Sequence, residues 1–176
     1  AQYALAAIAR GARIRSFASI AGWYHDAASV ASFYGGAEGA RLRIGRAREA
    51  LETWAKTGEV IMVPAYRPAD DRAGIFFELD YYANPGRGAV PEWKNEMAEM
   101  SWLFWLTFDG VRSAGEVSVP TLMVHSDGCV FPEHAKAVYA ALRGPKRLEW
   151  TEGSQIDFYD QLSQVTNAVA LAASHF

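Results

Sequence analysis

The side chains best suited to acid–base chemistry follow two predicted strands. Asp127 lies in the turn after the apolar run TLMVH, where a carboxylate can accept a hydrogen bond from an imidazole and stabilise the imidazolium. The alternative is that Asp127 and Gly128 only form a turn, for which Asp-Gly is a common pair. His25 follows an earlier strand within the sequence WYHD, as a candidate general base or as a structural histidine. These residue types favour proton transfer at the ends of strands.

The remaining reactive side chains are weaker candidates. Cys129 could act as a nucleophile, but it follows Asp127 in the same acidic turn, which raises a thiol pKa and favours a small, partly buried residue. His125 lies inside a strand and is expected in the core, whereas His134 and His175 are expected in solvent. No His, Cys, Asp or Glu spacing indicates a metal site, and no glycine-rich loop indicates a nucleotide. We expect no cofactor.

The pattern of strands and helices predicts an α/β fold. Apolar runs predict strands at residues 13–21, 120–125 and 146–151, and helical periodicity predicts helices at residues 3–10, 39–58 and from Pro132. Strands separated by helices pair in parallel. One face of the C-terminal helix is expected to be buried, and its apolar residues are Phe158, Leu162, Val165, Val169 and Ala172.

Three segments together resemble the α/β-hydrolase superfamily, and within it the dienelactone-hydrolase-like branch that includes polyketide-transferase-like hydrolases. They are AGWYHD at 21–26, PTLMVHSDG at 120–128 and EGSQIDFYDQ at 152–161. The resemblance covers the C-terminal half of the family's domain and implies that Asp127 is the catalytic acid and that Gln155 occupies the position of the catalytic histidine. An amide does not titrate, so Gln155 can orient a water or a substrate but cannot carry a proton away. The base is then His25 or an unconventional arrangement around Gln155.

The resemblance also implies that the nucleophile lies outside this chain. AQYALAAIA resembles the start of the helix that follows the family's nucleophile elbow, which places a Cys or Ser a few residues before Ala1. Independently, a sheet of only three strands would leave an unpaired apolar edge that recruits another strand. We therefore expect a partner, the N-terminal half of the same hydrolase domain.

The implied organisation has three parts. Residues 1–29 follow the nucleophile elbow, residues 30–115 form a helical, aromatic-rich lid, and residues 116–176 form the last strands and helices of the core. The side chains expected to bind substrate are Trp23, Tyr24, Trp102, Trp105 and Tyr159. For the aromatic block around Trp102 and Trp105, the alternative is a core or a subunit interface in a homo-oligomer.

Composition limits the classes of partner. The chain has 176 residues, a net charge of −3 and no run of like charges, which disfavours nucleic-acid binding. A single cysteine excludes an internal disulfide and fits a reducing compartment, so we expect a cytoplasmic protein. The alanine-rich N-terminus is too short and too interrupted by arginine to cross a membrane.

Two functions follow from these patterns. The first is a hydrolase or acyl transferase acting on an ester, a lactone or another activated carbonyl compound with an apolar portion. The second is a non-catalytic or atypical relative in which the absence of the histidine leaves a ligand-binding pocket.

Overall fold

The computed structural model describes all 176 residues, which form two compact units. One unit combines Ala1–Asp26 with Asp109–Phe176 and contains a parallel sheet. The other consists of Ala27–Phe108. No helix combines the length and the apolar character that a bilayer crossing requires.

The parallel sheet has three strands in the order β1-β4-β5. They are β1 (Phe17–Ile20), β4 (Thr121–Gly128) and β5 (Lys146–Ser154). The central strand β4 is buried from Thr121 to Ser126, as expected for a strand covered on both faces. The predicted α/β class is confirmed, although β1 is shorter than the predicted strand because Arg13 to Arg15 are exposed and lie before the sheet.

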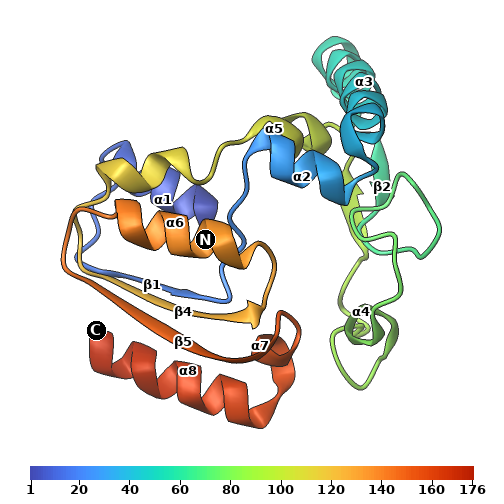
Figure 1. The fold of residues 1–176 in the computed structure, drawn as a ribbon. Helices are drawn as coiled ribbons and strands as arrows, with labels where there is room; N and C mark the ends of the chain where they lie inside the picture. Colours follow the sequence, from blue (N-terminus) through green and yellow to red (C-terminus); the bar gives the residue numbers. More distant parts are fainter. The chain divides into compact units, whose positions relative to one another are not determined.

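Helices cover both faces of this sheet (Figure 1). The helices α1 (Gln2–Ala9), η1 (Arg112–Glu116) and α6 (Pro132–Ala141) lie on one face, and α8 (Leu162–His175) lies on the other after the short α7 (Asp157–Asp160). Side chains alternate along β4, so Met123 packs with Leu5 and Val138 on the first face. Leu122 packs with Phe158 on the second face.

The predicted buried face of the C-terminal helix is correct at Phe158 and wrong at Leu162 and Val169. Leu162 is 81% exposed and Val169 is 58% exposed, whereas the neighbouring Ala168 is buried against the sheet. Small alanine side chains let the helix approach the strands closely, and the larger apolar residues then point away from this sheet. Leu162 and Val169 are therefore left without a partner in the core of this unit.

The second unit mixes helices with a small sheet. Its helices are α2 (Ala27–Phe33), α3 (Gly36–Thr57), α4 (Asp80–Ala83) and α5 (Ser101–Thr107). The strands β2 (Met62–Pro64) and β3 (Glu96–Ala98) pair in antiparallel fashion, so the segment is less purely helical than predicted. Its core consists of Val30, Tyr34, Ala40, Ala47, Trp102 and Leu106.

Candidate functional site

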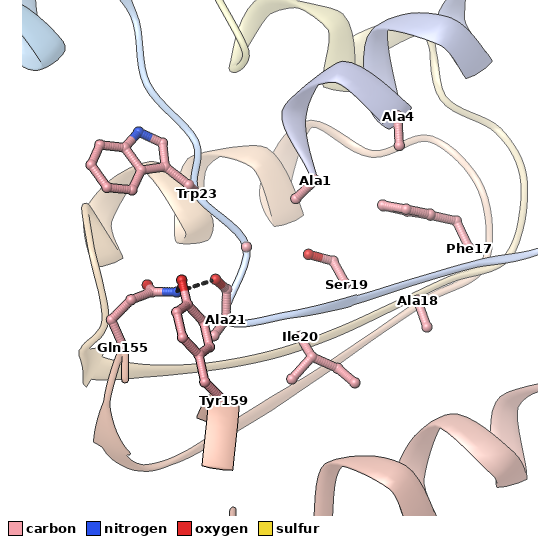
Figure 2. A pocket seen from close by; sticks show the side chains of 11 residues that line it. Ala1, Ala4, Phe17, Ala18, Ser19, Ile20, Ala21, Trp23, Gln155 and Tyr159 are labelled. Carbon is pink, nitrogen blue, oxygen red and sulfur yellow. Dashed lines mark hydrogen bonds between the residues drawn. The ribbon is translucent and has the colours of Figure 1, made fainter. Parts of the chain in front are cut away.

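A cavity of about 430 Å³ lies beside β1 (Figure 2). It is lined by every residue of Phe17–Ile20, by Ala1 and Ala4 at the start of α1, and by Gln155 and Tyr159. Successive side chains of a strand point to opposite faces of a sheet. A cavity lined by four consecutive strand residues therefore runs along the edge of the strand.

This edge of β1 carries no neighbouring strand, because β1 pairs only with β4. The amide of Phe17 donates to the carbonyl oxygen of Pro120 (2.9 Å), and the amide of Ala21 donates to that of Val124 (2.8 Å). Alternate residues of a strand direct their backbone groups to the same side. The backbone groups of Ala18 and Ile20 thus point to the open edge, which can accept another strand.

The turn after β1 is tightly constructed. Ala21 has a φ of +45°, a left-handed conformation that is costly for a residue with a side chain. A Cβ atom at Gly22 would lie 2.3 Å from the Oγ atom of Ser19 and 2.7 Å from the hydroxyl of Tyr24, so only glycine fits there. Strained backbone of this kind is common beside functional sites.

Gln155 connects three segments at the carboxyl end of the sheet. Its Nε2 atom donates to the carbonyl oxygen of Ala21 (2.8 Å) and to the hydroxyl of Tyr159 (3.2 Å). Its Oε1 atom accepts from the amide of Val130 (3.1 Å) in the loop after β4. Figure 2 shows the Gln155 side chain reaching across to Ala21 at the mouth of the cavity. Both ends of the amide are therefore held in place.

Asp127 lies at the end of β4 but does not contact Gln155. Its carboxylate is 76% exposed and lies 3.5 Å from the ammonium of Lys136 on α6. The indole N–H of Trp150, together with Lys136, lowers the pKa of Asp127. Asp127 is an ionised, accessible carboxylate at the carboxyl end of the sheet, where the catalytic acid was predicted, but it has no hydrogen bond to any histidine.

His25 and Tyr24 are fully buried behind the cavity wall. The indole N–H of Trp23, which does line the cavity, donates to Nδ1 of His25 (2.7 Å). The hydroxyl of Tyr24 donates to the Oγ atom of Ser19 (2.6 Å), and burial raises the pKa of Tyr24 to about 12. In this arrangement Trp23 links His25 to the cavity wall, and Tyr24 supports Ser19 from inside the core.

The other candidates contact the cores of their own units. Trp102 is buried in the core of the second unit, and Trp105 packs against the same core. His125 is a core residue that stacks on Trp150, and burial lowers its pKa. Cys129 is buried, and burial raises its pKa, which disfavours the thiolate. No three His, Cys, Asp or Glu side chains converge on a metal-binding geometry.

Sequence reasoning missed the parts of the cavity formed by small residues. Ala1, Ala4, Ser19 and Gly22 line it, yet none is a reactive residue type in a motif. The available signal was the position of Gly22 at the end of a strand, where open α/β sheets form their crevices. Of the predicted site residues, the structure brings Trp23, Gln155 and Tyr159 together.

No family model and no curated protein sequence matches this chain. Solved structures do match it. A hypothetical protein from Pseudomonas aeruginosa is 19% identical with a TM-score of 0.69, and the match covers 99% of this chain and 58% of that chain. The α/β-hydrolase GrgF from Penicillium sp. sh18 is 17% identical with a TM-score of 0.66, over 99% of this chain and 60% of that chain.

A third match is DcsB, solved as a complex with its substrate analogue. It is 16% identical with a TM-score of 0.65, and the match covers 98% of this chain and 59% of that chain. This chain thus spans about three fifths of the length of the structures that it matches. At these identities the likeness concerns the fold.

Proposed function

Because this chain adopts part of the α/β-hydrolase fold, we propose that it forms part of an enzyme that cleaves an ester, a lactone or a related activated carbonyl compound. The observation that carries the proposal is the cavity at the open edge of β1, where Gln155 lies at the carboxyl end of the sheet. Ligands of open α/β sheets bind outside the carboxyl ends of the strands. At this end of the cavity, the apolar ring of Trp23 suits a substrate with an apolar portion.

The nucleophile in this proposal is a Ser or Cys on a strand that pairs with the open edge of β1. Such a strand would form hydrogen bonds with the backbone of Ala18 and Ile20, would fill the part of the cavity that runs along them, and would end near Trp23 and Gln155. The chain's own candidates are poorly placed, because Ser19 is bound by Tyr24 and Cys129 is buried. The partner is the N-terminal half of the same hydrolase domain, and residues 27–108 are proposed to act as its lid.

In the proposed reaction the nucleophile gives its proton to the base as it attacks the substrate carbonyl, the base passes that proton to the leaving alkoxide, and water hydrolyses the acyl-enzyme. Gln155 cannot accept a proton, and its amide is already held by Ala21 and Val130. We assign it the task of fixing the two turns beside the cavity. His25 is the proposed base, and its Nδ1 atom becomes accessible when a ligand displaces the Trp23 indole and the Gln2 amide, which lie 2.7 and 3.4 Å from it. Asp127 supplies negative charge at the carboxyl end of the same sheet.

A second function is favoured by one observation. The only titratable side chain that lines the cavity is Tyr159. A cavity of this kind can bind an apolar carbonyl compound without turning it over, and the protein would then be a ligand-binding relative of hydrolases.

Replacing Gln155 by histidine separates the two functions. In the hydrolase, produced from its full reading frame so that the nucleophile is present, Gln155→His introduces a proton acceptor at the expected position and raises kcat/KM for p-nitrophenyl butyrate by about 100-fold or more, the range of general-base catalysis. Asn167→His, on the exposed surface of α8, is the matched control and leaves the rate unchanged. Saturable binding of the ester with no turnover in either variant would contradict the hydrolase and support the binding protein.

A further inference from the structure

The guanidinium of Arg43 is buried in the second unit without a carboxylate partner. Arg43 lies on α3 and is 5% exposed. Its Nη1 atom donates to the carbonyl oxygens of Tyr34 (3.0 Å) and Gly39 (3.3 Å), whereas its buried Nε atom has no hydrogen-bond partner. A buried charge is costly unless it is paired and hydrogen-bonded. Arg43 therefore retains an unused donor and an uncompensated charge.

Aromatic rings surround this guanidinium but cannot satisfy it completely. The rings of Tyr34, Phe76 and Trp102 lie 5.3, 5.4 and 5.3 Å from its central carbon atom. Ring faces attract a cation, but they are poor acceptors for an N–H group. Burial lowers the pKa of Arg43, and the charge of Asp71 opposes this effect. An anion bound beside Arg43 would favour the charged form further.

A cavity of about 320 Å³ adjoins Arg43. Tyr34, Leu42 and Phe76 form its apolar walls. The cavity lies at the N-terminus of the 22-residue helix α3, where Gly35 is the N-cap and no side chain caps the helix. The partial positive charge at a helix N-terminus attracts an anion, as does the positive charge of the guanidinium.

One acidic side chain also lines this cavity, and its charge is largely compensated. The carboxylate of Asp71 is 3.1 Å from Arg46, which itself lies 3.7 Å from the buried Glu99. Glu99 is in turn held by Arg72 at 2.6 Å. The acidic groups on this side therefore already have cationic partners, and Arg43 is left for a ligand.

We propose that this cavity binds a small organic monocarboxylate. The carboxylate lies against Arg43, and the apolar part of the ligand packs on Tyr34, Leu42 and Phe76. This site belongs to the unit formed by Ala27–Phe108 and does not depend on the proposed hydrolase activity.

Calorimetric titration of the protein with hexanoate and with hexanamide, its neutral isostere, tests the proposal. Hexanoate is expected to bind at least about tenfold more tightly, as is typical of a hydrogen bond to a charged group. Arg43→Met removes this preference. Arg48→Met removes an exposed charge from the same helix and serves as the matched control, in which the preference stays.

A second pair of variants keeps the test valid if Arg43→Met disturbs the aromatic packing, which circular dichroism would reveal. Leu42 is 46% exposed at the cavity wall, so Leu42→Glu adds a negative charge without altering the core. It is expected to weaken hexanoate binding about tenfold more than Leu42→Gln, which removes the same apolar contact without adding a charge. Equal binding of hexanoate and hexanamide, or unchanged hexanoate binding in folded Arg43→Met or in Leu42→Glu, would overturn the proposal and leave Arg43 a structural residue.

Discussion

Replacing Gln155 by alanine should destabilise the sheet-containing unit by about 2 kcal/mol. The substitution removes the bonds to the carbonyl oxygen of Ala21 and from the amide of Val130, and each neutral hydrogen bond contributes about 1 kcal/mol. The third bond, to Tyr159, is exposed, so water replaces it at little cost. The left-handed Ala21 loses the contact that holds its turn.

Urea unfolding followed by circular dichroism measures this effect. With an m-value of about 2 kcal/mol/M, the midpoint should fall by about 1 M while the slope stays the same. Tyr159→Phe removes only the exposed bond and should cost less than about 0.5 kcal/mol. Gln155→Glu keeps an oxygen that accepts from the amide of Val130 but loses the N–H group that donates to Ala21. In acid the protonated carboxyl group regains a donor, so the loss in free energy of unfolding should be smaller there.

The reasoning on Gln155 is refuted if Gln155→Ala costs no more than Tyr159→Phe. In that case the amide does not hold the two turns, and its place at the cavity has no structural explanation. A larger cost in Gln155→Ala, with partial recovery of Gln155→Glu in acid, is the result that we expect.

Three further predictions concern the same unit. In residues 1–176 without the proposed partner strand, the amides of Ala18 and Ile20 should exchange with deuterium about 100-fold faster than those of Phe17 and Ala21, because they point to the open edge; equal protection would show that the edge is covered. Cys129 should react with iodoacetamide at pH 8 about tenfold more slowly than free cysteine, since burial raises its pKa; reaction at the rate of free cysteine would place the thiol at the surface. His125 has a pKa below its usual value of 6.5, so the unfolded chain binds its proton first and stability falls as the pH drops below about 6.5. His125→Phe should flatten this dependence in pH-dependent unfolding, and an unchanged slope would assign it to other groups.

The order of strands and helices in the last third of the chain could be predicted from the sequence. Pro120 precedes a run that is apolar at every position, which indicates a central strand, and the structure places β4 between two neighbours. Pro132 begins α6, as expected of proline in a first helical turn, and Ala135 and Val138 are buried as predicted. These local signals agree with the observed fold, so they were sufficient to predict β4 and α6.

The buried face of α8 could not be predicted, because apolar residues occur on two of its faces. Leu162 and Val169 define the more hydrophobic face, but Ala168 defines the face that fits closely against the sheet. Choosing between them requires knowledge of the neighbouring layer. Hydrophobicity alone therefore placed Leu162 and Val169 on the buried face, where the structure has Ala168.

The candidate site was only partly predictable. The positions of Trp23 and Gln155 follow from the rule that strand ends meet at one edge of a parallel sheet. The burial of His25 depends on Gln2 and Trp23, which no local pattern connects. Arg43 was missed because an arginine in an amphipathic helix normally indicates an exposed face. Its spacing from Ala40, Ala47 and Ala50, which are all buried, was the available signal.

We propose that the attacking atom reaches this cavity from a strand outside residues 1–176. Labelling the protein produced from its full reading frame with a β-lactone probe, which acylates both serine and cysteine nucleophiles, tests this claim most directly. We predict that peptide mapping finds the acyl group on a Ser or Cys outside these residues. Acylation of Ser19, Ser126 or Cys129, or binding of the probe without any acylation, would contradict it.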